Sequence, residues 1–242
     1  MIRIKQTGSM KSEVAEAALG QLSESRLIND AIGTFEPRAQ LEVLFNDSMG
    51  GMEGQLGATY AIQSGKLMSA THVKEPPLVD VIGEVGPSDY LALLLIDVDW
   101  PRPATTRVEA GQREMEEAAR QAAHSDDKVN WLLVDIPGAI ATIEGIPAKD
   151  YEVIPYEPPE PKAGVHRLVF VLCKQGQQAT GLLRDEGSRL TLARDKFPTR
   201  RFLREHDMQP IGAVYFLCQS SIAVPTVGQV SSSAQPPVPS VS

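Results

Sequence analysis

Two carboxylates stand one residue apart where an apolar run ends, a spacing that can support chemistry. The segment LLLIDVDWPRP, residues 93–103, begins as a buried strand and then places Asp97, Asp99 and Trp100 before two prolines. Because side chains alternate faces along a strand, Asp97 and Asp99 share a face unless the turn at Pro101 has already begun. Two like charges that close require a cation, a proton or a bound ligand. The segment is therefore either a binding site or an acidic strand end in solvent.

The elements that would position these acids are mostly short apolar strands. The sequence predicts strands at 40–45, 58–62, 77–83, 90–99, 129–138, 166–175 and 211–219. Helices are expected at 12–24, at 109–123 and around the basic cluster TRRFLR, residues 199–204. Many short strands and few helices, separated by proline-rich loops, predict a mostly-β single domain.

The chain divides into three parts by composition. We expect an N-terminal arm with a helix at residues 1–26, a globular domain at 27–219 and a disordered Ser/Pro tail at 220–242. Residues 1–9 are either native or a leader in front of Met10, and the sequence leaves both open.

Charge and cysteine placement exclude several classes of partner. A formal net charge of −8 argues against nucleic acid and against docking on anionic lipid, because both need clustered Lys and Arg. The sequence has no apolar span of the length that a membrane helix needs, so we expect no stable membrane insertion. Cys173 and Cys218 lie in apolar strands, which indicates reduced core thiols and a cytoplasmic protein.

Four segments, taken together and in order, resemble the phosphatidylethanolamine-binding protein (PEBP) family. LLLIDVDWPRP resembles that family's strand ending in Asp-Pro-Asp-x-Pro, and VNWLLVDIPG resembles its His-Trp-Leu-Val segment. EPPEPKAGVHRLVFVLCKQ resembles the proline loop with His-Arg, and RDKFPTRRFLREHDMQPIGAVYFLCQ resembles the Phe-x-Thr-Arg-x-Phe helix and closing strand. The N-terminal helix is most similar to the branch of fungal carboxypeptidase Y inhibitors. The resemblance implies a β-sandwich with one small anion-binding pocket.

Position by position, the resemblance also implies the site residues. The ligand-binding set comprises Asp97, Trp100, Pro101, Asn130, His166 and the loop around Pro159 and Pro161. Asp99 and Arg167 are expected to form a structural pair, so that each acid has its own cationic or protonated neighbour.

This chain departs from the family pattern at four positions within the matching segments. Val98 replaces the Pro between the acids, Trp100 replaces a small residue, and Leu168 replaces the Tyr of His-Arg-Tyr. Asn130 replaces a pocket His, and an amide cannot carry positive charge. A charge-assisted bond of ~1.5–3 kcal/mol would then become a neutral one of ~1 kcal/mol. We therefore expect a retained pocket with altered ligand chemistry.

Two functions remain open. The first is a non-enzymatic binding and regulatory protein whose ligand is a small phosphate or carboxylate anion; in one version it inhibits a serine carboxypeptidase of the carboxypeptidase Y type. The alternative is an enzyme or accessory of a fungal secondary-metabolite pathway, where a polyketide-derived anhydride would be cyclised or dimerised beside a pathway enzyme. We expect no cofactor, and no metal, because His72, His124 and His206 lack metal-ligand spacing.

Overall fold

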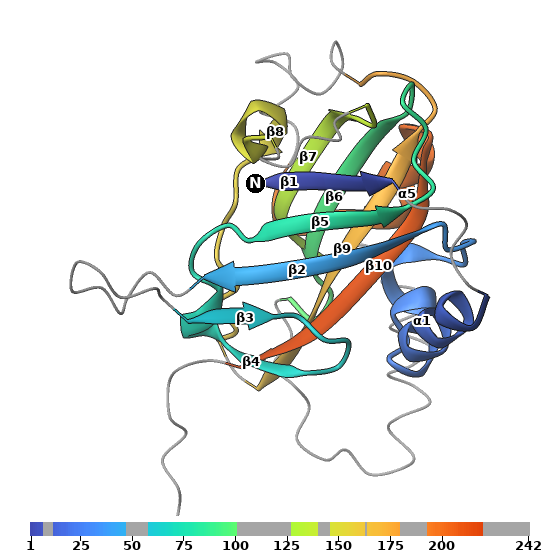
Figure 1. Ribbon diagram of the computed structural model, residues 1–242. Coiled ribbons are helices and arrows are strands. Elements are labelled where there is room, and N and C mark those ends of the chain that lie inside the picture. The colour runs from blue at the N-terminus through green and yellow to red at the C-terminus, as the bar shows by residue number, and fades with distance from the viewer. Residues whose placement is uncertain are drawn as a thin grey trace, which may run out of the picture.

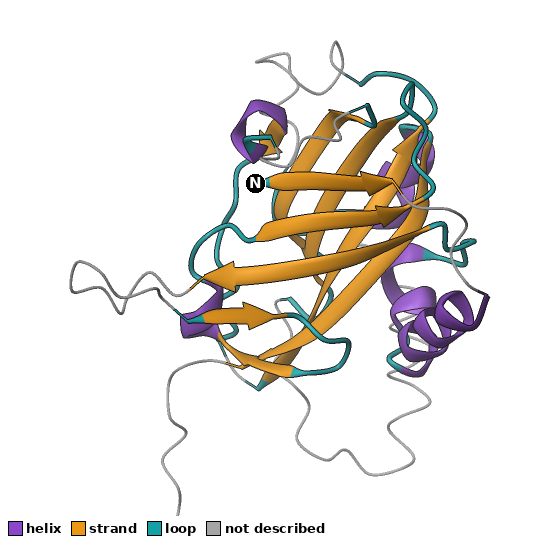
Figure 2. Ribbon diagram, in the orientation of Figure 1, coloured by secondary structure: helices purple, strands orange, loops and turns teal. Residues whose placement is uncertain are grey.

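Two mixed β-sheets pack face to face and a few short helices flank them (Figures 1 and 2). The structure is a computed structural model that describes residues 1–6, 12–46, 58–100, 127–139, 146–162, 164–179 and 193–219. The expected helix at 109–123, the tail at 220–242 and Pro101 lie outside the described residues. The mostly-β architecture predicted from the sequence is confirmed.

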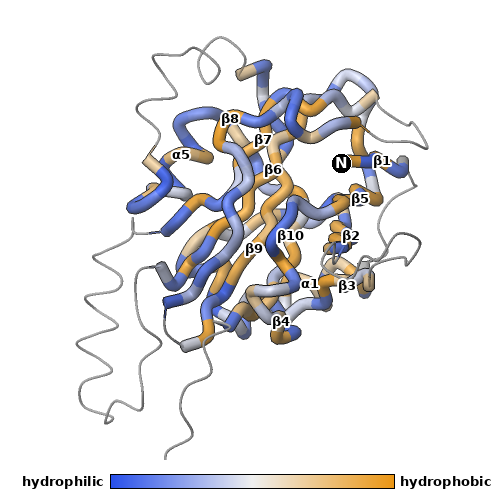
Figure 3. The backbone as a smooth tube through the Cα atoms, turned by 90° about the vertical axis from the view of Figure 1, so that its left-hand side faces the viewer, coloured by the Kyte–Doolittle hydropathy of each residue, from blue (hydrophilic) through white to orange (hydrophobic). Residues whose placement is uncertain are grey.

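The larger sheet has six strands, and all but one neighbouring pair are antiparallel. Its order is β4 (Leu67–Ser69), β10 (Met208–Gln219), β9 (Val165–Gln175), β6 (Tyr90–Asp97), β7 (Lys128–Pro137) and β8 (Glu152–Ile154). The exception is the parallel pair β4–β10. The central strands β6, β7 and β9 are near-continuous apolar runs because both of their faces are covered, and Figure 3 shows them in the colours of hydrophobic residues.

The smaller sheet has four strands in the order β1 (Ile2–Gln6), β5 (Leu78–Gly83), β2 (Ala39–Asn46) and β3 (Thr59–Ala61). Strand β2 alternates buried and exposed residues, as expected where only one face packs on a core. The N-terminal arm contributes β1, which pairs in parallel with β5. The arm therefore shares a sheet with the globular domain.

The six-stranded sheet separates two hydrophobic cores. One core lies between the two sheets and includes Trp131, Phe45, Phe170 and Phe216. The other lies on the opposite face, under α1 (Ser12–Glu24), the π-helical turn η1 (Ile28–Ile32) and α5 (Thr199–Glu205). The remaining helical turns are η3 (Ala70–Val73) and η4 (Ala148–Tyr151). Within the described ranges, no helix has the length and apolarity needed to cross a membrane.

The long strands and the short strand β3 were predicted from the sequence, whereas three other short strands were not. Strands β2, β5, β6, β7, β9 and β10 coincide with predicted runs to within a few residues. Strands β1, β4 and β8 were missed because three to five residues give too little periodicity to distinguish a strand from a loop. Tertiary pairing alone makes them strands.

Strand β10 passes very close to the backbone of β2 at Gly212. A Cβ atom added there would lie 2.4 Å from the carbonyl oxygen of Ala39, so the contact has no room for a side chain. The register of β10 against β9 also shifts between Pro210 and Gly212, which marks a local irregularity. Gly212 thus sets how closely the two sheets approach at this corner.

We predict that Gly212→Ala lowers the free energy of unfolding by about 1–3 kcal/mol, the usual cost of overpacking. Gly20→Ala is the matched control, because nothing lies within 4 Å of the added methyl group on α1. That change should leave stability unchanged or raise it by about 0.5–1 kcal/mol. Urea denaturation of both variants measures the difference; equal effects would contradict the packing explanation.

Candidate functional site

A buried histidine–carboxylate pair lies at the end of the central strands of the larger sheet. His166 near the start of β9 contacts Asp97 at the end of β6, with 2.8 Å between Nδ1 and Oδ2. Both side chains are almost fully buried, 1% and 2% exposed. The carboxylate therefore fixes the orientation of the imidazole ring. The second oxygen of Asp97 accepts a hydrogen bond from the backbone N–H of Asp99 at 3.0 Å.

Asp99, the second acid, does not lie on the sheet face that carries Asp97 and His166. Asp99 lies in the turn after β6, where Nε and Nη2 of Arg167 donate to its two carboxylate oxygens at 3.0 and 2.9 Å. His166 and Arg167 are consecutive on β9, so their side chains leave opposite faces of the sheet. Asp97 and Asp99 therefore do not share a face, because the chain has already turned after Asp97, which is the second of the two cases that the sequence left open.

Arg167 also connects the sheet to the N-terminal arm. Its Nη1 atom donates to the backbone carbonyl of Ser25 at 2.6 Å and to the carboxylate of Asp30 at 2.9 Å. One guanidinium thus joins the β6 turn to the end of α1 and to η1. Arg200 of α5 adds a bond to the carbonyl of Ile28 at 2.7 Å.

Burial and neighbouring charges shift the pKa values of Asp97 and Asp99 in opposite directions. Desolvation raises the pKa of Asp97, and the hydrogen bond from His166 only partly offsets it. Desolvation also acts on Asp99, but the hydrogen bonds and positive charge of Arg167 outweigh it and lower the pKa of Asp99. Asp99 is therefore ionised at neutral pH and has a structural role. Asp97 has a carboxyl group whose charge is costly to keep, a common feature of functional sites.

Two further side chains belong to the inter-sheet surroundings of Asp97. Burial, together with the nearby charge of Asp97, raises the pKa of the Cys218 thiol to about 12. Cys218 pairs with His166 across β9 and β10. Tyr156 donates its hydroxyl to the carbonyl of Val73 at 2.6 Å, and burial raises its pKa. Both groups are neutral at physiological pH and add no charge to the site.

A group of cations, the basic rim, adjoins Asp97 on the neighbouring strand and loop. Lys128 is the cross-strand partner of Asp97, and its ammonium group forms an ion pair with Glu157. Arg194 contacts the same carboxylate, with 3.2 Å between Nε and Oε2. Lys162, which lies over the Trp100 ring together with Lys128, completes the basic rim of Lys128, Lys162 and Arg194.

Trp100 lies against two of these cations. The ammonium nitrogens of Lys128 and Lys162 are 4.3 and 5.2 Å from the centre of the indole ring. Both distances are within the range of a cation–π interaction. Trp100 is partly exposed, so it forms a wall of the rim and is not a core residue.

Asn130 occupies a β-bulge that re-aims its side chain. The partners of Leu95 and Ile96 on β7 are two residues apart, which leaves Asn130 as the extra residue. Its Nδ2 donates to the carbonyl of Glu157 at 3.0 Å, which fixes the orientation of the amide. Its buried Oδ1 has no hydrogen-bond partner in the described part of the chain.

The proline loop places the acid and one cation of the basic rim. Pro159 and Pro161 are both buried, whereas Lys162 is exposed. The buried prolines anchor the loop that presents Glu157 and Lys162. Across the residues that the structure describes, no group of His, Cys, Asp and Glu side chains has the arrangement of a metal site.

Sequence reasoning missed most of the basic rim. Lys128, Glu157 and Arg194 come from a strand start, a proline loop and the segment before α5, which are far apart in the chain. A lysine that opens an apolar strand opposite an acidic strand end was the only available signal. The rest required tertiary pairing.

Comparison with known proteins shows the same architecture. No family model matches the chain. A carboxypeptidase Y inhibitor, solved in complex with its cognate proteinase, superposes with a TM-score of 0.56 at 14% identity, covering 86% of this chain and 98% of that one. A phosphatidylethanolamine-binding protein from Plasmodium vivax gives a TM-score of 0.56 at 16% identity, covering 84% and 97%. These likenesses define the class of fold.

The sequence comparison agrees with the fold. CEN-like protein 4 from Nicotiana tabacum is 28% identical over 199 residues, which cover 82% of this chain and 91% of that protein. The chain belongs to the phosphatidylethanolamine-binding protein family.

The lowered pKa of Asp99 predicts acid sensitivity. An acid with a depressed pKa stabilises the fold fully above its ordinary value of 3.8 and loses that contribution as the pH falls through the depressed value. We expect Asp99→Asn to cost about 1.5–3 kcal/mol at pH 7 and much less near pH 2. Denaturant unfolding across this pH range measures the difference.

Glu24→Gln is the control for this experiment, because Glu24 is an exposed carboxylate on α1. It should change stability by less than about 0.5 kcal/mol at either pH. If Asp99→Asn costs the same at pH 2 as at pH 7, the loss comes from packing and not from the ion pair with Arg167.

Proposed function

We propose that this protein binds a small anion of the phosphate or carboxylate type at the end of β6, β7 and β9. The observation that carries the proposal is the basic rim beside the buried Asp97–His166 pair. Its three cations and one acid leave a local charge of about +2 on a chain whose net charge is −8. A positive rim on an acidic protein attracts anions to that place.

Lys162 offers the most direct contact to such a ligand. Lys128 and Arg194 already share Glu157, whereas Lys162 forms no ion pair with another described residue. It is also exposed, so an anion can reach it without displacing protein. An anion placed between Lys162 and Lys128 would reduce the repulsion between two ammonium groups on one indole ring.

The buried Asp97–His166 pair has a supporting role in the proposed site. Asp97 holds the ring of His166 in one orientation, and Asn130 ties β7 to the proline loop through Glu157. These side chains support the shape of the site, and Pro159 and Pro161 keep the loop in place. We assign ligand contact to the rim and positioning to the buried pair. Pro101 belongs to the proposed set by sequence position alone.

The alternative of a pathway enzyme has weaker support. A buried acid with a raised pKa beside an imidazole suits proton transfer, but both groups are almost fully buried. Binding at the exposed rim requires no such access.

We predict that Lys162→Gln weakens the binding of phosphorylethanolamine by about three- to tenfold, since it removes one charge-assisted contact. The weakening should shrink as salt is added, because the lost interaction is electrostatic. Isothermal titration calorimetry at low and high salt measures both effects.

Lys174→Gln is the matched control. Lys174 lies at the other end of β9, where it pairs with Asp89 at 2.8 Å. It carries the same charge but lies away from the rim, so its removal should leave the affinity unchanged. Equal losses for the two variants would reduce the proposal to a general charge effect, and no measurable binding by the unaltered protein would refute it.

A second proposed function is inhibition of a serine carboxypeptidase. It is supported by the fold likeness to the carboxypeptidase Y inhibitor and by the helix-bearing arm, whose helix α1 is largely exposed. Deleting the arm is an unsuitable test, because β1 pairs in the smaller sheet and Leu22 of α1 is buried.

We predict instead that the full chain inhibits carboxypeptidase Y, and that Glu13→Lys combined with Glu24→Lys on α1 weakens this inhibition at least tenfold. Both residues are exposed, so the fold should persist. Asp195→Lys, an exposed charge reversal before α5, is the control and should inhibit normally. Steady-state assays decide, and absence of inhibition by the unaltered chain excludes this function.

A further inference from the structure

Two cations of the basic rim already hold an anion, the carboxylate of Glu157. The ammonium group of Lys128 contacts one of its oxygens, and the other oxygen lies 3.2 Å from Nε of Arg194. A small oxyanion ligand would use the same kind of contact, a charge-assisted hydrogen bond from each cation. The chain thus places one of its own carboxylates where an anion of the phosphate or carboxylate type would bind.

Both cations are also positioned by contacts that do not involve this carboxylate. Arg194 donates from Nη2 to the carbonyl of Pro155 at 2.8 Å and from Nη1 to the carbonyl of Asn130 at 3.2 Å. The ammonium nitrogen of Lys128 is 4.3 Å from the centre of the Trp100 ring, which adds a cation–π contact. Both cations can therefore keep their places when the carboxylate leaves, and they then present two positive charges to an incoming anion.

The backbone of Glu157 is fixed, whereas its side chain can turn. Its N–H donates to the carbonyl of Asn130 at 2.8 Å, and its own carbonyl accepts from Nδ2 of Asn130 at 3.0 Å. The Glu157 side chain is 39% exposed, whereas that of Lys128 is only 10% exposed. The carboxylate therefore lies nearer to solvent than the ammonium group that it binds. Rotation about its own side-chain torsions can carry it into water without any movement of the loop.

Lys128 requires a negative partner, whichever group supplies it. A largely buried ammonium group without a partner is costly, because it has lost most of its hydration. Glu157 supplies that partner in the free protein, and a bound anion would supply it in the complex. The two anions are therefore alternatives at one cation, so the free energy of displacing Glu157 is subtracted from the free energy of binding.

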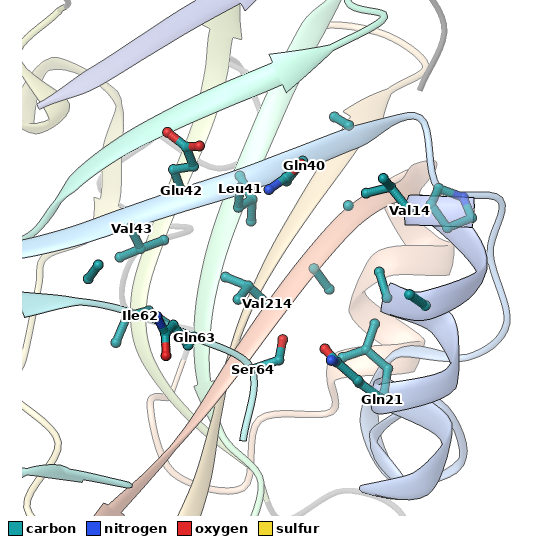
Figure 4. A pocket seen from close by; sticks show the side chains of 18 of the residues that line it. Val14, Gln21, Gln40, Leu41, Glu42, Val43, Ile62, Gln63, Ser64 and Val214 are labelled. Atoms are coloured by element: carbon teal, nitrogen blue, oxygen red, sulfur yellow. The ribbon is translucent and has the colours of Figure 1, made fainter. Parts of the chain in front are cut away.

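The cavity shown in Figure 4 does not offer the anion a separate place. It has a volume of about 720 Å³ and lies between α1, β2 and β10, where Leu41, Val43 and Val214 contribute to its lining. None of the three cations of the basic rim is among the described residues that line it. An anion that depends on these cations therefore binds where Glu157 lies, and the two have to exchange.

We propose that Glu157 is an internal competitor for the anion site, an inference that rests on the proposed anion binding. In the free protein its carboxylate occupies Lys128 and Arg194. A bound anion replaces it there and also contacts Lys162, while the Glu157 side chain turns into solvent. Glu157 thereby sets a threshold for binding, because an anion must gain more from the three cations than the carboxylate gains from two. The affinity is lowered by the factor that this displacement costs.

Calorimetric titration with phosphorylethanolamine tests the proposal on three variants of the full chain. Glu157→Gln should bind about fivefold or more tightly than the unaltered protein, because the competitor is gone. Glu157→Asp keeps the charge on a side chain one methylene shorter, which reaches the two cations less well, so a smaller gain is expected. Glu160→Gln is the matched control, because it removes the same charge from an exposed carboxylate on the same loop. It should change the affinity by less than about twofold.

Thermal unfolding gives a second readout that separates competition from a merely structural ion pair. Glu157→Gln should lower the Tm of the free protein, since Lys128 loses its partner, and phosphorylethanolamine should then raise the Tm more than it does for the unaltered chain. A structural ion pair alone would lower the Tm without tighter binding.

The outcomes separate this inference from the anion site itself. If the unaltered chain binds and Glu157→Gln binds equally or more weakly, Glu157 is no competitor and the anion site stands. Equal gains in Glu157→Gln and Glu160→Gln would also overturn the inference, because they would show a general effect of charge. Absence of binding in the unaltered chain and in all three variants would overturn both proposals.

Discussion

Two consecutive residues of β9 determine the organisation of this protein, because His166 and Arg167 project from opposite faces of one sheet. Each holds one acid from the end of β6, so two carboxylates that are adjacent in sequence are separated by the backbone itself. Like charges that would repel on a common face are instead each neutralised or hydrogen-bonded. The turn after Asp97, held by the N–H of Asp99, makes this separation possible.

The same arrangement divides the molecule into two sides with different roles. On the inter-sheet side, Asp97 and His166 lie behind the basic rim. On the other side, Arg167 binds Asp99 and the N-terminal arm through Asp30. An isolated ion pair at the surface contributes little, but a partly buried guanidinium with several acceptors is costly to break. The arm is therefore attached to the backbone that carries the site, although it lies on the opposite face of the sheet.

Sequence reasoning predicted what depends on local pattern and missed what depends on pairing. The apolar runs of β6 and β9 are long enough to be identified as strands. The resemblance of their segments to the PEBP family then predicted that Asp97 and His166 belong to one site. The sequence left open whether Asp97 and Asp99 share a face, because the alternation of a strand does not tell where the following turn begins, and the structure has the turn directly after Asp97. The contact of Lys128 with Glu157 was missed because its partners meet only after β7 and the proline loop have packed.

The position of β10 has a consequence for how the chain reaches this structure. This strand is the last described element in sequence, yet it lies between β4 and β9 and touches β2 at Gly212. During synthesis, β4 and β9 therefore keep unpaired edges until β10 has left the ribosome. Pairings this distant in sequence are slow to form, since chain entropy is lost before contacts compensate for it. Nascent chains of this protein should consequently depend on chaperones more than helical proteins of equal length.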